Sequence, residues 1–292
     1  MNRVKDGFLL TRNPFNANQI KRISLEPKDV DAIIFWTRNP KDLIKHIPTL
    51  EKIGYRFYFQ YTITGYPRAY ESSTPKPANA IDTFCELSNI IGSNRVIWRY
   101  DPIILTNHLN LEEHKRLFSK IASMLTGRTQ RVVISFADFY KKTAKNLEKI
   151  PDIEYYEITE SKNLLYELVS HMKKVADSYG ITIQSCSEDI DLEKFGVSHG
   201  KCIDDELLAD IYNLHLPYTK DKNQREACGC IKSIDIGAYN TCLHGCSYCY
   251  ATFNEKFVLS NRKKHDPNSP FLIGEIDQEY MKKYIPIQKS LL

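Results

Sequence analysis

The chain has 292 residues, of which 42% are hydrophobic and 26% are charged, so it can bury one sizeable core. Its formal net charge of +4 and pI of about 8.5 fall short of the basic excess typical of a dedicated nucleic-acid-binding domain, so nucleic acid is neither required nor excluded. The N-terminal segment lacks the features of a signal peptide and no 18-residue apolar run occurs, which predicts a cytoplasmic protein with no membrane partner.

Short β-branched and aromatic runs alternate along the chain with segments of helical periodicity, which is the pattern of βα units. In chain order the predicted strands are Asp31–Thr37, Arg56–Thr64, Arg95–Ile103, Arg131–Asp138, Ile181–Glu188 and Ser233–Gly237. Six such units in one chain predict an α/β fold with an open or partial parallel barrel. A doubly wound sheet is the alternative.

Several predicted helices have recognisable ends. One begins at Asn39 and Pro40 and stops before Gly54, and another lies within Asn110–Gly127. A third runs from Ser161 to Tyr179, and its predicted buried face consists of Leu165, Leu168, Val169, Met172 and Ala176. We expect residues 1–226 to form the barrel core. Residues 227–292 would supply the closing strand, a cysteine-rich loop and the C-terminal segment.

Polar side chains end most of the predicted strands, and in parallel barrels the chemistry lies at the carboxyl ends of the strands. Strand alternation predicts that these side chains line one polar mouth: Gln60, Thr62, Arg99, Asp101, Ser135, Cys186 and Glu188. Arg99 is a candidate for holding a carboxylate or phosphate, and Asp101 for holding a ribose hydroxyl or another polar group. The alternatives are a mutual ion pair between these two residues and strand ends that are polar only because they approach solvent.

Three of the eight cysteines form a compact motif, Cys242-Leu243-His244-Gly245-Cys246-Ser247-Tyr248-Cys249. In a reducing cytosol such cysteines are better candidates for metal ligation than for disulfides. Thiolates bind iron–sulfur clusters and structural zinc, and zinc sites usually contain two CxxC-like pairs. A triad without a fourth partner at fixed distance suits a 4Fe–4S cluster that leaves one iron open.

This motif resembles the signature of the radical SAM superfamily, CxxxCxφC, with Tyr248 as the aromatic residue before the last cysteine. The resemblance implies that Cys242, Cys246 and Cys249 bind three irons and that the fourth iron binds S-adenosylmethionine. One electron from a reductant such as flavodoxin or ferredoxin would then generate a 5'-deoxyadenosyl radical. It also implies a (β/α)6 TIM-like barrel, here permuted because the triad lies near the C-terminus, with Ser233–Gly237 as its first strand. The polar residues that end the strands, Gln60, Thr62, Ser135 and Glu188, are together with Tyr248 the candidate cofactor contacts.

A closer resemblance spans nearly the whole chain. The segments that carry it include LLTRNPFN, IIFWTRNP, VIWRYDPI, VISFADFYKKT, GKCID, CGC and DIGAYNTCLHGCSYCYA. They are similar to an uncharacterised bacterial family, catalogued as a domain of unknown function, that has a radical-SAM-like cysteine cluster at its C-terminus. That family usually has one further strand upstream, so we expect either a truncated start or a barrel that lacks one strand. A distant likeness to spore photoproduct lyase indicates nucleic-acid repair or modification as one alternative.

Four further cysteines lie near turns or polar residues and form a candidate second metal site: Cys186, Cys202, Cys228 and Cys230. Such a site would hold an auxiliary iron–sulfur cluster or a zinc ion. The alternative is that these are small packed side chains without a metal. Cys85 lies in a helical run and is expected to be a core thiol.

Two classes of function follow from these motifs. The first is a radical SAM enzyme with Arg99 and Asp101 in its active site and a small-molecule or nucleic-acid substrate. The second is a non-catalytic iron–sulfur or zinc protein that serves in electron transfer, sensing or binding.

Overall fold

The computed structural model describes residues 1–13, 16–137, 141–186, 190–220 and 224–275. The chain forms two compact units. One comprises Met1–Asp31, Asp235–Leu243 and Tyr250–Leu292, and the other comprises Ala32–Ile234 and His244–Cys249. We call the second one the sheet unit. These units are interleaved along the chain, so they divide it differently from the expected segments 1–226 and 227–292, which stay a prediction.

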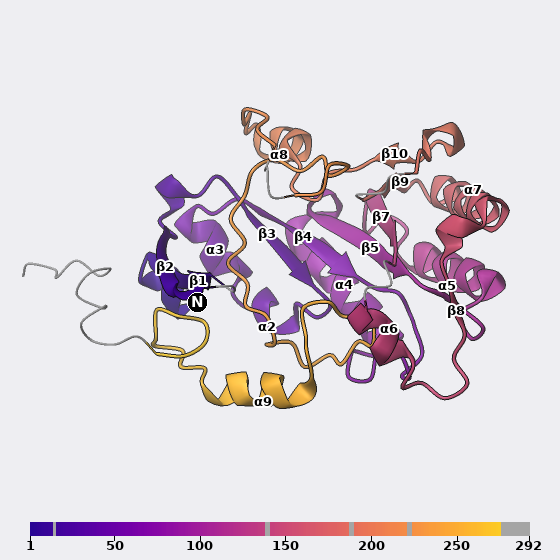
Figure 1. Ribbon diagram of the computed structural model, residues 1–292. Helices are drawn as coiled ribbons and strands as arrows, with labels where there is room; N and C mark the ends of the chain where they lie inside the picture. Colours follow the sequence, from indigo (N-terminus) through magenta and orange to yellow (C-terminus); the bar gives the residue numbers. More distant parts are fainter. Residues whose placement is uncertain (14–15, 138–140, 187–189, 221–223, 276–292) are drawn as a thin grey trace, which may run out of the picture. The chain divides into compact units, whose positions relative to one another are not determined.

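The centre of the sheet unit is a six-stranded parallel sheet in the order β10-β9-β7-β5-β4-β3 (Figure 1). Its strands are β3 (Ile33–Thr37), β4 (Phe57–Thr62), β5 (Val96–Ile103), β7 (Arg131–Phe136), β9 (Thr182–Ser185) and β10 (Ser198–His199). All pairs are parallel, so the carboxyl ends of the strands meet at one edge. The order across the sheet follows the order along the chain.

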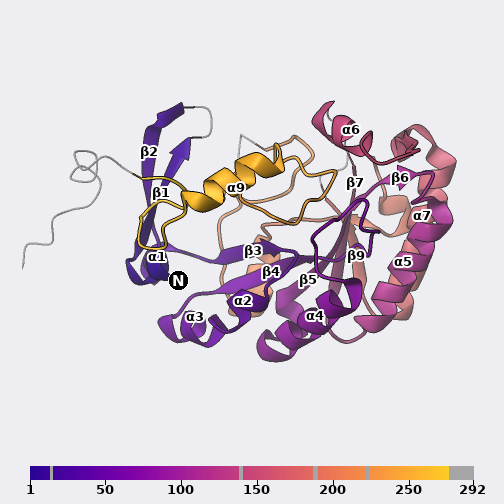
Figure 2. The same ribbon diagram turned by 90° about the horizontal axis from the view of Figure 1, so that it is seen from below.

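Helices cover one face of this sheet, as Figure 2 shows for α3, α4, α5 and α7. The helices that follow the strands are α2 (Lys41–Ile44), α3 (Ile47–Ile53), α4 (Pro77–Ile91), α5 (Leu111–Met124), α6 (Lys141–Leu147) and α7 (Lys162–Ser178). Aromatic side chains join the layers: the ring of Phe84 stacks on Tyr61 with centroids 5.3 Å apart, and that of Phe118 on Trp98 at 4.9 Å. This face holds most of the large buried side chains, and their burial stabilises the unit.

The opposite face is apolar near the start of the strands and polar near their ends. Tyr58, Ile97 and Val133 form a buried cluster with Leu207 and Leu208 of α8 (Asp205–Tyr212). Two short antiparallel strands, β6 (Leu105–Thr106) and β8 (Tyr155–Tyr156), pair beside the sheet. The sheet is therefore covered by helices on one face and by α8 with its flanking segments over part of the other.

The other unit contains an antiparallel pair, β1 (Phe8–Asn13) with β2 (Asn16–Ser24), and two helices, α1 (Asn2–Lys5) and α9 (Glu255–Lys263). The remaining helical segments among the described residues are 3-10 turns at Pro27–Asp29, Ser93–Arg95, Ile158–Glu160 and Glu193–Phe195. None of the helices in the described ranges has the length and apolar character needed to span a bilayer.

Five of the six predicted strands are confirmed, but the one at Ser233–Gly237 is wrong. There the side chain of Asp235 accepts a hydrogen bond from the backbone N–H of Gly237 at 2.7 Å, and such a local turn competes with strand pairing. The sixth position of the sheet is taken by β10. A permuted order that starts at Ser233–Gly237 therefore has no strand to begin it.

Candidate functional site

The last six residues of the cysteine motif, His244–Cys249, belong to the sheet unit and lie along the loop that follows β4. Glu71 and Cys246 form an antiparallel backbone bridge. The N–H of Ser247 donates to the carbonyl of Tyr70 at 2.8 Å, and that of Ser73 to the carbonyl of His244 at 2.9 Å. Because the loop follows the carboxyl end of a parallel strand, these cysteines lie at the edge where such sheets carry their chemistry.

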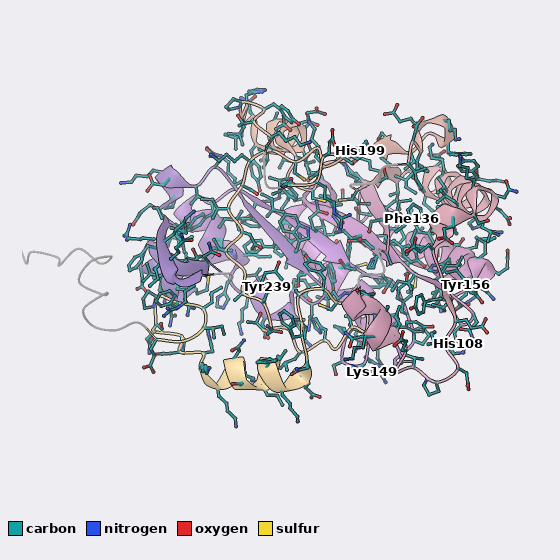
Figure 3. All side chains as sticks on the ribbon, in the orientation of Figure 1. His108, Phe136, Lys149, Tyr156, His199 and Tyr239 are labelled. Carbon is teal, nitrogen blue, oxygen red and sulfur yellow. The ribbon has the colours of Figure 1, made fainter. Side chains whose placement is uncertain are left out.

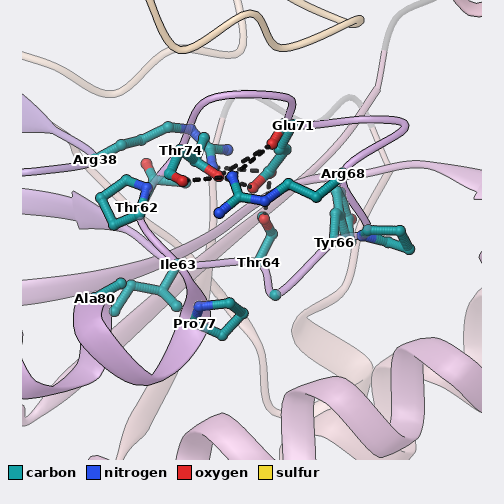
Figure 4. Close-up of a pocket in the computed structure, with 13 residues that line it drawn as sticks. Arg38, Thr62, Ile63, Thr64, Tyr66, Arg68, Glu71, Thr74, Pro77 and Ala80 are labelled. Carbon is teal, nitrogen blue, oxygen red and sulfur yellow. Dashed lines mark hydrogen bonds and ion pairs between the residues drawn. The ribbon is translucent and has the colours of Figure 1, made fainter.

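A partly buried network of polar and charged groups joins this loop to Arg38 and Glu71, which Figure 4 labels. Arg38, which follows β3, donates to Glu71 at 2.8 Å and to the hydroxyl of Tyr248 at 2.5 Å. The hydroxyls of Thr64 and Tyr248 both donate to the same carboxylate oxygen of Glu71. Burial raises the pKa of Tyr248 well above its ordinary value, and Glu71 raises it further although Arg38 opposes this. Tyr248 is therefore neutral and donates its hydroxyl hydrogen to Glu71. The positive charge of Arg38 also interacts electrostatically with Cys246.

A cavity of about 230 Å³ opens next to this network, in the loop between β4 and α4 (Figure 4). Its wall includes Arg38 and Glu71 together with Thr62, one of the predicted cofactor contacts. Arg68 closes another side and donates to the backbone carbonyl of Thr74 at 2.6 Å. The cavity thus presents one buried cation, one buried anion and hydroxyl groups to a ligand.

Four of the predicted strand-end residues meet on the polar face of the sheet. Arg99 forms an ion pair with Asp101 at 2.7 Å and donates to Gln60 at 3.4 Å, and Ser135 donates to Asp101. Burial alone would raise the pKa of Asp101, but Arg99 and the Ser135 hydroxyl outweigh it and lower the pKa below its ordinary value. The positive charge of Arg38 also lowers the pKa of Asp101, so the residues around Asp101 interact electrostatically with the network that contains Arg38. The mutual ion pair, one of the interpretations of Arg99 and Asp101 from the sequence, is therefore confirmed.

The four cysteines of the candidate second site also lie together in the sheet unit. The sulfurs of Cys186 and Cys202 are 3.0 Å apart, the thiols of Cys202 and Cys230 are hydrogen-bonded, and so are those of Cys230 and Cys228. The hydrogen bond to Cys186 lowers the pKa of Cys202, but its bond to Cys230 and its burial raise that pKa to about 11. In the described ranges, no three His, Cys, Asp or Glu side chains are already arranged as a metal-binding group. The four thiols thus form a chain of pairwise contacts.

A family model described as "Domain of unknown function (DUF1848)" matches residues 1–251. The chain belongs to the DUF1848 family. None of the curated proteins compared with the sequence matches it. Among solved structures, the DUF1848 chain is similar to a proposed alpha-L-fucosidase from Bacteroides thetaiotaomicron VPI-5482, with 13% identity and a TM-score of 0.26. The match covers 57% of this chain and 67% of the other.

The remaining predicted site residues of the DUF1848 chain are distributed as follows. Cys246, Tyr248 and Cys249 are in the sheet unit, whereas Cys242 is in the other unit and is exposed. None of the three triad cysteines forms a disulfide with another described residue. Cys246 and Cys249 are connected by a turn in which the N–H of Cys249 donates to the carbonyl of Cys246 at 3.1 Å. Three cysteine side chains on one short stretch of chain are the kind of donor set that iron–sulfur clusters use. Glu188 lies outside the described residues.

Sequence reasoning missed two polar residues of the DUF1848 chain. Glu71 is a single carboxylate in a loop, and only its pairing with Arg38 and Tyr248 in space identifies it. His114 is fully buried on α5, where it accepts from Tyr100 at 3.0 Å and donates to the carbonyl of Ile104 at 2.9 Å. His114 lies four residues before Phe118, on the same face of the helix, and this spacing could have predicted its burial.

Proposed function

We propose that this chain is a radical SAM-type enzyme that binds a 4Fe–4S cluster on Cys242, Cys246 and Cys249. The observation that carries the proposal is the CxxxCxxC spacing with Tyr248 before the last cysteine. Support comes from the backbone pairing of its last six residues with the loop that follows β4. When bound, the cluster supplies one electron that cleaves S-adenosylmethionine into methionine and a 5'-deoxyadenosyl radical.

The fold that suits this activity is an open (β/α)6 barrel. Two features support it: the six strands are parallel, and their order across the sheet follows their order along the chain without reversal. A doubly wound sheet contains a point where the order reverses. In the open barrel the face that carries Gln60, Arg99 and Asp101 is the interior, and β10 takes the sixth position.

The chain's own residues have distinct roles in this proposal. Arg38 carries a partly buried positive charge that interacts electrostatically with Cys246, and cations near a thiol favour the thiolate that metals bind. Tyr248 and Glu71 hold Arg38 in position. The cavity beside them would bind the polar part of S-adenosylmethionine or of the substrate, with Thr62 on its wall. Arg99 and Asp101, farther across the polar face, would orient the substrate.

The reductant is a low-potential one-electron donor such as flavodoxin or ferredoxin, and we place the enzyme in the cytoplasm. Eight cysteines without a disulfide among the described residues are compatible with such a compartment. The substrate is a small molecule or a nucleic acid.

Anaerobic reconstitution with iron and sulfide, followed by iron analysis and electron paramagnetic resonance of the reduced protein, tests the cluster. The wild-type chain should give the signal of a reduced 4Fe–4S cluster, and S-adenosylmethionine should change that signal because it binds the open iron. Replacing the three triad cysteines with Ala should abolish the signal, whereas Cys85→Ala, in α4, should leave it unchanged. A signal that S-adenosylmethionine does not alter would indicate the alternative, a non-catalytic iron–sulfur protein.

A further inference from the structure

The four cysteines outside the triad come from three separate segments that the fold brings together. Cys186 directly follows β9, Cys202 precedes α8, and Cys228 and Cys230 lie in a later loop of the same unit. His199, labelled in Figure 3, ends β10 at the start of the segment that carries Cys202. The side chains are joined in one chain of contacts, and the two central members, Cys202 and Cys230, are buried.

The sulfurs accept hydrogen bonds from backbone and guanidinium donors. The N–H groups of Cys202 and Ile203 both donate to the sulfur of Cys230, at 3.1 and 3.3 Å. Nη1 of Arg99 donates to the sulfur of Cys202 at 2.8 Å. Packed structural thiols need no such donors, whereas bound thiolates are stabilised by them. The donor pattern is therefore that of a metal–thiolate site.

The loop that carries Cys202 is held firmly against the sheet. The backbone carbonyl of Cys202 accepts hydrogen bonds from the hydroxyl of Tyr58 at 2.6 Å and from the side-chain amide of Gln60 at 3.0 Å. Gly229, between the last two cysteines, packs so closely on Lys201 that a Cβ atom would come within 3.3 Å of that side chain. The protein's own contacts therefore fix the positions of the segments that carry Cys202 and Gly229.

We propose that Cys186, Cys202, Cys228 and Cys230 bind one zinc ion in a closed four-thiolate site. The short distance between one pair of sulfurs favours zinc over a cluster. Sulfurs on one tetrahedral zinc are about 3.8 Å apart, because each Zn–S bond is about 2.3 Å long. Thiolates on a 4Fe–4S cluster each bind a different iron and lie farther apart. The 3.0 Å between the sulfurs of Cys186 and Cys202 is shorter than both spacings and is therefore nearer to that on zinc than to that on a cluster.

One rotation closes the site. The thiol of Cys228 donates to the side-chain oxygen of Gln224 at 2.7 Å, so its hydrogen points towards Gln224 and not towards the other sulfurs. Turning the Cys228 side chain away from Gln224 would bring its sulfur to the zinc. The ion then ties the segments around Cys202 and Cys230 to the end of β9, over the polar face that carries Arg99.

The test uses the full chain with Cys242, Cys246 and Cys249 replaced by Ala, so that its outcome does not depend on the proposed activity. This protein should contain about one zinc and no iron per chain. Adding Cys228→Ser or Cys230→Ser should reduce zinc at least tenfold, whereas adding Cys85→Ser should not. Because Cys230→Ser places a hydroxyl at a buried position, the Cys228 variant and far-UV circular dichroism separate metal loss from unfolding.

A second measurement requires no further substitution. After zinc is removed with a chelator, Co²⁺ should restore one equivalent of binding with the intense visible absorption of tetrahedral four-thiolate cobalt. Purified protein without zinc that also fails to bind Co²⁺ would overturn the proposal. So would about four irons per chain with sulfide, or a Cys186–Cys202 disulfide found by mass spectrometry.

Discussion

Asp101 neutralises a guanidinium that has almost no access to water. Arg99 is 5% exposed, and its ion pair with Asp101 is supplemented by the hydroxyl of Ser135. Removing one partner of a buried pair leaves an uncompensated charge, which typically costs about 3 kcal/mol or more. We therefore expect Asp101→Asn to lower the free energy of unfolding by about 3 kcal/mol in denaturant titrations. Ser135→Ala, which removes one hydrogen bond, should cost about 1 kcal/mol. Wild-type stability in Asp101→Asn would show that Arg99 has another partner.

His114 makes stability depend on pH. Burial lowers its pKa from 6.5 to about 4, so between these values the unfolded chain binds a proton that the folded chain does not. The stabilisation from neutral His114 is complete above pH 6.5 and is lost as the pH falls towards 4, by about 3 kcal/mol in total. Unfolding free energies measured across this range should fall with decreasing pH. The decrease should be smaller in His114→Gln, and an equal decrease in both proteins would contradict this role.

Single residues differ in how readily the sequence reveals them. His114 shares the apolar face of α5 with Phe118, so its burial could have been predicted. Glu71 is different, because its partners Arg38 and Tyr248 are 33 and 177 residues away and nothing in its local sequence indicates them. The meeting of Arg99 with Gln60 could be predicted from strand alternation, since both lie on the same face of parallel neighbours.

At the scale of elements, the cysteine loop depends on a glycine for its close approach to the loop after β4. Gly245 has a φ of +63°, and a Cβ atom there would collide with the hydroxyl of Ser72. Gly245→Ala should therefore displace the loop, and we expect it to lower the iron content after reconstitution several-fold. Gly274→Ala is the matched control, because Gly274 also has a positive φ but has no atom near its Cβ position. Equal iron contents in the two variants would indicate that this contact does not position the loop.

Elements with a strong local pattern were predictable, and those made by tertiary contacts were not. The buried face of α7 is the one expected from its apolar spacing, and Gly180 follows its end with a φ of +67°. In contrast, β10 has only two exposed residues and is a strand solely because it pairs with β9. Ser233–Gly237 has the alternating composition of a strand, but a side-chain turn at Asp235 and the absence of a partner among the described strands override it.

At the scale of the whole molecule, the sheet unit has a core that is independent of the triad cysteines. Its largest buried side chains lie on the sheet and its helices, and Cys242, Cys246 and Cys249 are exposed or partly exposed. Replacing all three with Ala should therefore leave far-UV circular dichroism and cooperative thermal unfolding close to those of the metal-free wild type. Loss of cooperative unfolding in this variant would mean that the loop is part of the folding core.

The most direct test of the proposed activity is the formation of 5'-deoxyadenosine. The reconstituted wild-type chain is incubated without oxygen with dithionite and S-adenosylmethionine, and the products are quantified by mass spectrometry against the variant in which Cys242, Cys246 and Cys249 are replaced by Ala. Radical SAM chemistry predicts 5'-deoxyadenosine and methionine from the wild type and neither above background from the variant. A wild type that carries the reduced cluster yet forms no 5'-deoxyadenosine, or a variant that forms as much as the wild type, would contradict the assignment.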